Sequence, residues 1–275
     1  MANYGARTYA ELVQYAAEAD SVVNIDNDIN ITDEYPDGDM PALTVNGTIE
    51  GHGCTISNWY HTANWGSNYI TFGDNGVIKN MKLKNIYCQV QGSLAFANHP
   101  SGNKNGYYFE DCEFTGIIVT GMFIRGYYVG DYLKHCSVNL LLKNDAGFSY
   151  VAQAFSKSGR MDNCYVKIKS ESTETKLFKG SIVNGGRDSY FEIETEHFFD
   201  GATCSVIFEN CVFDITTNAQ FTFDINSNVS PSILRASHAP NASCTNKISA
   251  VTEEYWLDAS YLKNTVGFNI IAEDE

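Results

Sequence analysis

The stretch Phe109-Glu110-Asp111-Cys112-Glu113-Phe114 carries a six-residue pattern that recurs along the chain. The pattern consists of an apolar residue, any residue, an Asn, Asp or His, a Cys or similar residue, any residue, and an apolar residue. Its other copies are Ile78–Leu83, Leu133–Val138, Met161–Val166 and Phe208–Phe213, with degenerate copies at Gly186–Phe191 and around Cys54. Counted at the fourth position, successive copies are 27, 31, 24, 28, 25 and 22 residues apart. A strand motif with a period in the twenties is typical of a solenoid, whose repeats must stack to bury their apolar faces.

The third position of the pattern predicts a sharp bend in each repeat. After the bend, apolar residues alternate, as in Cys164, Val166 and Ile168, which is the period of a strand with one buried face. The apolar residue before the bend, such as Met161, is an odd number of positions from the Cys and would point to the opposite face of a straight strand. Both side chains can face inward only if the chain turns between them. Residue types that tolerate left-handed backbone occupy this corner, at Asn80, Asp111, His135, Asn163, Asp188 and Asn210. Each repeat is therefore predicted to be a strand, a corner and a second strand.

The fourth position is predicted to return to one interior column at every turn of the solenoid. This structural ladder consists of Cys54, Met81, Cys112, Cys136, Cys164, Ser189 and Cys211. A buried free Cys behaves as a small hydrophobe. Adjacent coils lie about 4.8 Å apart, close to the distance at which a disulfide forms, so distance alone leaves oxidation open; we favour buried thiols. The chain has no Cys-x-x-Cys pair, so we predict no zinc site.

With these corners, the chain resembles parallel β-helix proteins of the pectate-lyase-like type. The resemblance covers roughly residues 20 to 250 and includes Ile49-Glu-Gly-His-Gly-Cys-Thr-Ile56, which is similar to an early coil of that family. It implies an all-β fold, a single-stranded right-handed parallel β-helix solenoid with an N-terminal capping helix and a small C-terminal cap. We place the capping helix in residues 1–20, the β-helix in 21–250 and the C-terminal cap in 251–275.

Residues 8 to 19 have the pattern of an amphipathic helix. Thr8 is followed three positions later by Glu11, which is a capping box, and Leu12, Val13 and Ala16 follow at helical spacing. We expect the helix to cover the open end of the first coil, where an exposed edge would promote aggregation. A helix that binds a partner is the alternative.

Composition limits the classes of partner. The formal charge of −15, with 18 scattered Lys and Arg, opposes binding to nucleic acid, which requires clustered cations. No apolar run is long enough to cross a membrane, so we expect no membrane partner. The sequence begins Met-Ala-Asn-Tyr-Gly without a cationic and apolar leader, and we therefore expect synthesis in a cytoplasm without export by a signal peptide.

The sequence predicts no catalytic residue, no cofactor and no metal. Gly51-His52-Gly53 is similar to one element of polygalacturonases, but the other motifs of that family are missing, so we interpret it as a corner. Glu192 and Glu194 have the same parity in a predicted strand and are expected on a solvent-facing side. Many carboxylates are present, yet their spacing does not single out a pair for glycoside hydrolysis.

Aromatic residues in loops are the candidate contacts with a partner or a glycan. They are Trp59, Tyr60, Trp65, Tyr127 and Tyr128, together with Arg125, which could bind a sugar carboxylate. The pectate-lyase arginine motif is missing around Arg125. Most of these rings are expected to pack a loop onto the solenoid or to fill a subunit interface, ahead of glycan binding.

Two classes of function remain. The first is a structural phage virion protein, an outer capsid decoration or cementing protein, made in the host cytoplasm and located on the virion surface. It would be a homo-oligomer, a homotrimer by analogy with similar β-helices, docked on the major capsid protein or another virion protein. We favour this class because only about twenty residues precede the first coil, too few for a separate particle-binding domain. The alternative is a polysaccharide lyase or glycoside hydrolase of tailspike type, or a glycan-binding adhesin.

Overall fold

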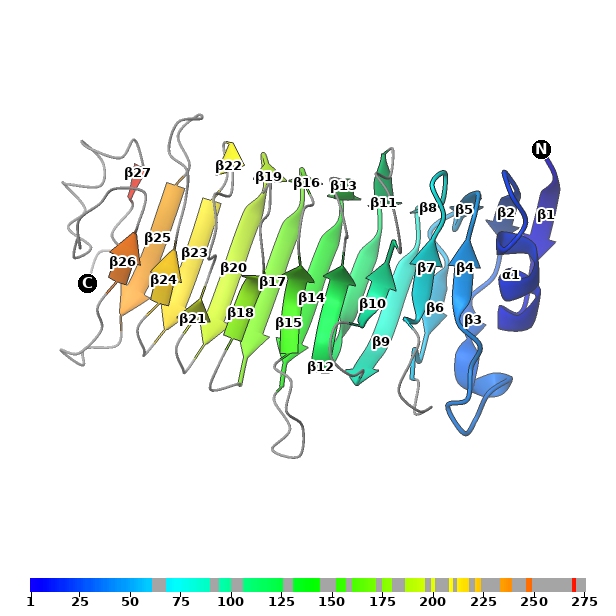
Figure 1. Cartoon of the computed structure of the whole chain (residues 1–275), viewed down its shortest axis with the longest axis horizontal. Helices are drawn as coiled ribbons and strands as arrows, with labels where there is room; N and C mark the ends of the chain where they lie inside the picture. The colour runs from blue at the N-terminus through cyan, green and yellow to red at the C-terminus, as the bar shows by residue number, and fades with distance from the viewer. Residues whose placement is uncertain are drawn as a thin grey trace.

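Parallel strands stack into a rod, with α1 at the N-terminal end (Figure 1). The computed structural model describes residues 1–60, 68–89, 94–99, 106–125, 131–143, 152–156, 160–171, 175–179, 186–195, 199–200, 208–209, 212–217, 221–223, 233–238, 246–248 and 269–270. Every named strand pairing in this part of the chain is parallel, for example β1 with β2 and β14 with β17. The predicted all-β parallel solenoid with a helix at its N-terminal end is confirmed.

Each coil of the rod contributes to three faces. Sheet A contains β1 (Asn3–Ala6), β2 (Val22–Ile25), β5 (Thr48–Glu50), β8 (Val77–Lys79), β11 (Tyr107–Glu110), β13 (Asp131–Lys134), β16 (Arg160–Asp162), β19 (Gly186–Arg187) and β22 (Phe208–Glu209). Sheet B contains β3 (Ile29–Asn30), β6 (Thr55–Ser57), β9 (Lys82–Gln89), β12 (Glu113–Arg125), β14 (Ser137–Leu142), β17 (Tyr165–Ser170), β20 (Tyr190–Thr195), β23 (Val212–Thr217), β25 (Ile233–His238) and β27 (Asn269–Ile270).

The third face, sheet C, is joined to sheet B through one long strand. It contains β4 (Leu43–Val45), β7 (Ile70–Phe72), β10 (Ala95–Asn98), β15 (Ala152–Ser156), β18 (Thr175–Lys179), β21 (Phe199–Asp200), β24 (Phe221–Phe223) and β26 (Asn246–Ile248). The first half of β12 pairs with β14 in sheet B, and its second half pairs with β10 and β15 in sheet C. Sheets B and C are therefore continuous at this coil.

The N-terminal segment is both a helix and a strand. The helix α1 spans Tyr9–Ala16, and the Thr8 hydroxyl accepts a hydrogen bond from the Glu11 amide at 3.2 Å. The Glu34 carboxylate, which follows the short 3-10 helix η1 (Ile31–Asp33), accepts from the Tyr9 and Ala10 amides. A carboxylate at this end also suits the helix dipole.

Two boundaries in this segment differ from the expected ones. The helix ends at Ala16 rather than at residue 19, and the Ala16 and Ala17 carbonyls accept hydrogen bonds from Asn46 instead of from a further helical turn. Residues before the helix form β1, which pairs with β2 from Asn3↔Val22 to Ala6↔Ile25. The segment 1–20 thus adds a strand to sheet A besides covering the first coil. At the other end, β27 within 251–275 pairs with β25, and the rest of that segment lies outside the described residues.

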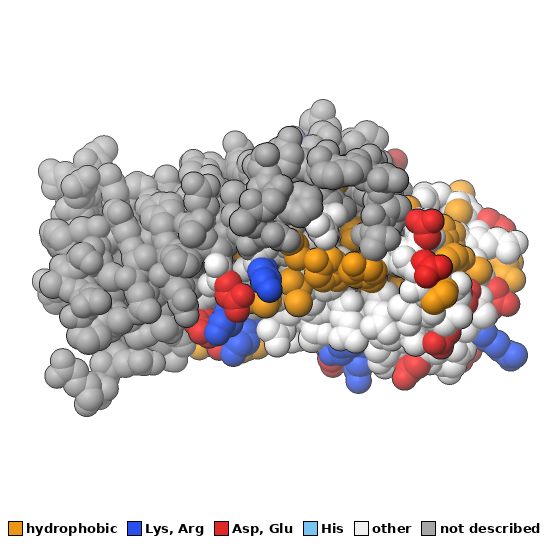
Figure 2. All heavy atoms as spheres, turned by 90° about the horizontal axis from the view of Figure 1, so that it is seen from below, with side chains coloured by type: hydrophobic (Ala, Val, Ile, Leu, Met, Phe, Trp, Pro, Cys, Tyr) orange, Lys and Arg blue, Asp and Glu red, His pale blue; other side chains and the backbone are white. Residues whose placement is uncertain are grey.

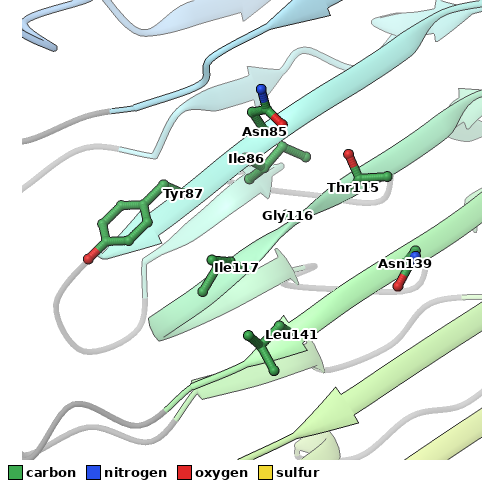
Figure 3. A pocket seen from close by; sticks show the side chains of 8 residues that line it. All are labelled: Asn85, Ile86, Tyr87, Thr115, Gly116, Ile117, Asn139 and Leu141. Atoms are coloured by element: carbon green, nitrogen blue, oxygen red, sulfur yellow. The ribbon is translucent and has the colours of Figure 1, made fainter.

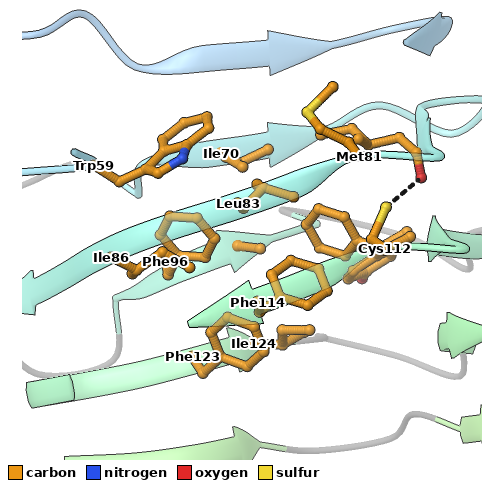
Figure 4. Close-up of a cluster of buried hydrophobic side chains, with 14 of the residues drawn as sticks. Trp59, Ile70, Met81, Leu83, Ile86, Phe96, Cys112, Phe114, Phe123 and Ile124 are labelled. Atoms are coloured by element: carbon orange, nitrogen blue, oxygen red, sulfur yellow. Dashed lines mark hydrogen bonds between the residues drawn. The ribbon is translucent and has the colours of Figure 1, made fainter. Parts of the chain in front are cut away.

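The interior contains a run of aromatic side chains from successive coils (Figure 4). Trp59 meets Phe96 edge to face at 5.5 Å, Phe96 stacks on Phe123 at 5.7 Å, and Phe123 meets Phe114 at 5.2 Å. These side chains are among the largest that are fully buried in the described part of the chain. Edge-to-face and offset pairs add stability beyond the burial of their area.

Candidate functional site

The ladder residues lie above one another in the rod. The amide that follows each ladder residue donates to the carbonyl of the ladder residue one coil earlier, as in Glu113 to Met81 and Ser137 to Cys112, both at 2.9 Å. Met81, Cys112, Cys136, Cys164 and Ser189 are each at most 3% exposed. Cys54 is partly exposed, and Cys211 lies outside the described residues.

The buried thiols among the described residues of this column are free and donate to backbone. Cys112 Sγ donates to the Ile78 carbonyl at 3.5 Å, and Cys136 Sγ donates to the Phe109 carbonyl at 3.6 Å. Ser189 Oγ donates to the Met161 carbonyl in the same way, at 3.3 Å. Burial raises the pKa of the Cys112 thiol, and hydrogen bonding to Cys136 together with burial raises the pKa of Cys164. The buried thiols and the Ser189 hydroxyl are therefore structural hydrogen-bond donors within the column.

Cysteine alkylation should distinguish the buried thiols from the partly exposed one. Because alkylation requires an accessible thiolate, we expect Cys112, Cys136 and Cys164 to be labelled by iodoacetamide at least tenfold more slowly than Cys54 in the native protein, a factor of about ten being a modest estimate for buried thiols. Peptide mapping by mass spectrometry gives the rate at each position. Equal labelling at all four would contradict a closed interior column.

The predicted corners have left-handed backbone. The φ values are 50° at Asn80, 55° at Asp111, 52° at His135, 54° at Asn163 and 48° at Asp188, and Asn210 lies outside the described residues. His52 and Gly53 also have positive φ, 48° and 82°. A tight turn in the backbone explains these residue types, and Gly51-His52-Gly53 forms a corner of the same kind.

Side chains at these corners form an exposed polar column. His135 Nδ1 lies 3.4 Å from Asp111 Oδ1, and Asn163 Nδ2 lies 3.4 Å from His135 Nε2. Asp111 and His135 are each about half exposed, so the pair is weak in water. Such contacts stabilise the stacking of coils and do not gather groups around a reacting atom.

A second corner column was not predicted from the sequence. Asn58 and Asn85 have φ of 63° and 53°. Asn85 Nδ2 donates to Asn58 Oδ1 at 3.1 Å, and Asn58 Nδ2 donates to Asn30 Oδ1 at 2.7 Å. The signal was present in the chain, since Asn30, Asn58 and Asn85 recur at steps of 28 and 27 residues, the same period as the ladder.

Trp59 is not a surface contact, which corrects one of the expected contact residues. Its side chain is 0% exposed, and its indole N–H donates to the Ile56 carbonyl at 3.0 Å. It also packs edge to face on Tyr9 of the capping helix, at 5.7 Å. The large apolar ring of Trp59 fills the space beneath α1, and its burial there is more favourable than exposure to water.

The other expected contact residues have different positions. Tyr60 is 40% exposed and packs against Tyr87, with ring centroids 5.0 Å apart. Arg125 ends β12 and is only 7% exposed, which removes it as an open surface contact. Trp65, Tyr127 and Tyr128 lie outside the described residues.

Carboxylates on the outer face of sheet B are paired with lysines of the preceding coil. Lys84 Nζ lies 2.9 Å from Glu113, Lys167 Nζ 2.5 Å from Glu192, and Lys169 Nζ 2.9 Å from Glu194. Lys167 and the Tyr165 hydroxyl lower the pKa of Glu192, and Lys84 lowers the pKa of Glu113. A general acid in glycoside hydrolysis requires a raised carboxyl pKa, so these two glutamates are unsuited to that role.

The substitution Glu192→Gln should show how little such a pair stabilises the fold. Glu192 has a lowered pKa in the folded state, so its contribution is present at neutral pH and is lost as the pH falls through that value. Both partners are partly exposed, so we expect a loss of about 0.2–1 kcal/mol at pH 7. Urea denaturation at pH 7 and at a series of pH values below about 4.3 measures the difference, which should shrink at the acidic end. A difference that grows on acidification would contradict the pairing.

The same outer face contains a groove between β9, β12 and β14 (Figure 3). Its volume is about 430 Å³. It is lined by Asn85, Ile86, Tyr87, Thr115, Gly116, Ile117, Asn139 and Leu141. The lining combines apolar side chains with amide and hydroxyl groups and includes no carboxylate, Lys, Arg or His. This groove is the candidate binding site in the described part of the chain.

In the described part of the chain, no three His, Cys, Asp or Glu side chains are grouped so that they could hold a metal ion. In the same residues, no helix is long and apolar enough to span a membrane.

Comparisons with known proteins show no family for this chain. No protein-family model matches, and no curated protein matches significantly. Among solved structures, the chain is similar to L. reuteri 53608 SRRP, with 12% sequence identity, 98% of each chain covered and a TM-score of 0.46. A similarity this low carries no argument about function.

Proposed function

We propose that the chain is a structural protein, a right-handed parallel β-helix of the pectate-lyase-like type that decorates the outside of a phage capsid as a rigid rod. In this role it docks on the shell through its loops or one end and stabilises the shell by adding buried interface. It would be present as a homotrimer, made in the host cytoplasm.

The observation that supports a structural role most directly is the pairing on the outer face of sheet B. Glu113, Glu192 and Glu194 each contact a lysine of the preceding coil, and the two carboxyls whose pKa values are lowered remain ionised at neutral pH. Ionised, paired glutamates are unsuited as general acids, which favours a structural role over glycoside hydrolysis. Inside the rod, buried free thiols and Ser189 donate to backbone carbonyls of the preceding coil. A rod whose coils are linked by buried hydrogen bonds suits a structural part.

Removal of the chain from particles tests the cementing role. A protein that binds only the assembled shell stabilises it by mass action. We expect particles without the chain to rupture at a lower temperature, and rupture to return to the original temperature when purified chain is added back. Release of DNA detected with an intercalating dye during a temperature ramp measures rupture. An unchanged rupture temperature would remove the cementing role.

A further inference from the structure

Two local features of the sequence lie at the groove between β9, β12 and β14. The first is Gly116, where an added Cβ would lie 2.5 Å from both Ile86 Cβ and the Ile86 carbonyl oxygen. The second is a bulge at Asn85, which shifts the pairing of β9 with β12 between Phe114 and Gly116. Glycine at position 116 lets β12 approach Ile86 of β9 closely, and the extra residue in β9 distorts the pairing of the strands that line the groove.

Apolar groups line one side of this groove. Tyr87, Ile117 and Leu141 are adjacent in the strand register of β9, β12 and β14, and each is partly exposed. Tyr60 extends the row toward the N-terminus, since it forms a bridge with Tyr87. In the surface view of Figure 2, hydrophobic side chains form a band that follows the long axis of the rod.

Polar but uncharged groups line the other side. Asn85, Thr115 and Asn139 contribute amides and a hydroxyl. The Asn85 amide is held in place by its bond to Asn58 at 3.1 Å. Two ion pairs flank the groove, Lys84 with Glu113 on one side and Lys169 with Glu194 beyond Leu141. The groove therefore offers hydrogen bonds and apolar contact without net charge.

We propose that this groove binds a neutral carbohydrate chain lying along the rod. Sugars present an apolar ring face beside hydroxyl groups, and they match a site in which an aromatic or aliphatic wall faces amides. The paired charges at the borders favour an uncharged ligand, and the overall charge of −15 repels acidic glycans. A second copy of this chain fits less well, because it would bury Thr115 and Asn139 against another surface that must then satisfy them.

The position of the groove makes the inference independent of the capsid role. The ligand would be held on sheet B, and the groove needs no other subunit to be complete. The apolar row crosses three coils at Tyr87, Ile117 and Leu141, so an extended oligosaccharide contacts several coils at once.

Methyl-labelled NMR of the isolated protein tests this inference. The probes are cellohexaose, maltohexaose and mannohexaose as neutral oligosaccharides and a galacturonate hexamer as the acidic one. We expect at least one neutral probe to shift the methyl signals of Ile86, Ile117 and Leu141 in a saturable way. In Asn139→Ala, loss of one hydrogen bond should weaken binding by about fivefold or more. Ile117→Lys, which places a long charged side chain across the groove, should abolish it.

Tyr165→Ala is the matched control, since Tyr165 is an aromatic residue 40% exposed on the same sheet and outside the groove. Its binding should equal that of the unmodified chain, and methyl spectra without sugar verify that each variant is folded. The proposal is overturned if no neutral probe shifts these signals, if only the acidic probe does, or if Ile117→Lys binds normally. It is also overturned if the same signals shift with protein concentration alone, since the groove would then be an interface between copies.

Discussion

Replacing Phe114 by alanine should lower the free energy of unfolding by about 3–5 kcal/mol. Phe114 is 1% exposed and meets Phe109 at 4.8 Å and Phe123 at 5.2 Å, both edge to face. Removal of the ring therefore leaves a cavity in the run of aromatic side chains, and neighbouring coils are held by their own hydrogen bonds and cannot collapse into it.

Urea denaturation followed by circular dichroism measures this loss. The matched control is Thr115→Ala, the next residue along β12, whose side chain is partly exposed on the outer face. We expect the control to change stability by no more than about 0.5 kcal/mol. If Phe114→Ala lost less than about 1 kcal/mol, a value well below the range for buried rings, the interior would not be packed as described.

Replacing Gly47 by alanine should cost about 1–3 kcal/mol. An added Cβ would lie 2.1 Å from the Ser21 carbonyl oxygen and 2.6 Å from the Ser21 amide nitrogen. The same carbonyl accepts the hydrogen bond of Thr48 N at 2.8 Å, at the start of the pairing of β2 with β5. Because the contact is with backbone, relief requires the two coils to separate, and that pairing is weakened.

A second glycine in the same region provides the control. At Gly5, in β1, an added Cβ would find no atom within 4 Å. We expect Gly5→Ala to be neutral or to stabilise by up to about 1 kcal/mol, since alanine restricts the unfolded chain. Thermal unfolding of both variants gives the comparison. Equal effects at the two positions would contradict the close approach of coils at Gly47.

The interior of this rod could be predicted from the sequence because the same requirements for burial and backbone conformation recur in every coil. A strand, a left-handed corner and a second strand bring Cys112, Cys136 and Cys164 back to the same place, and the carbonyls of these residues are hydrogen-bonded from coil to coil. Burial restricts the residue type at each such position. The corner is restricted as well, since few residue types accept a positive φ.

Features that depend on a single coil were harder to predict. Trp59 lies in an aromatic-rich stretch that resembles a loop for binding a partner. It is buried instead, because its ring packs beneath α1. The hydrogen bonds of the Asn30, Asn58 and Asn85 column link the first coils in the described part of the chain. The groove lies at Gly116 and at a one-residue shift in strand register. A repeating sequence pattern does not predict a feature that occurs at one position.

Function was the hardest part to predict, since it depends on outward-facing residues. On the outer face of sheet B, the row Tyr87, Ile117 and Leu141 continues as Lys169 and Glu194 in the next coils. The register tolerates both apolar and charged residues there, because the fold buries neither kind. Only the three-dimensional arrangement shows where the apolar part of the row ends and the paired charges begin.

The composition of purified particles tests the proposed structural role most directly. Cells that carry the gene are lysed, particles are isolated on a density gradient, and quantitative mass spectrometry compares this chain with the main shell protein. We expect the chain to sediment with the particles in a fixed ratio to the shell protein, and to resist washing. A chain found only in the soluble fraction, where it shortens bacterial polysaccharides, would contradict the proposal.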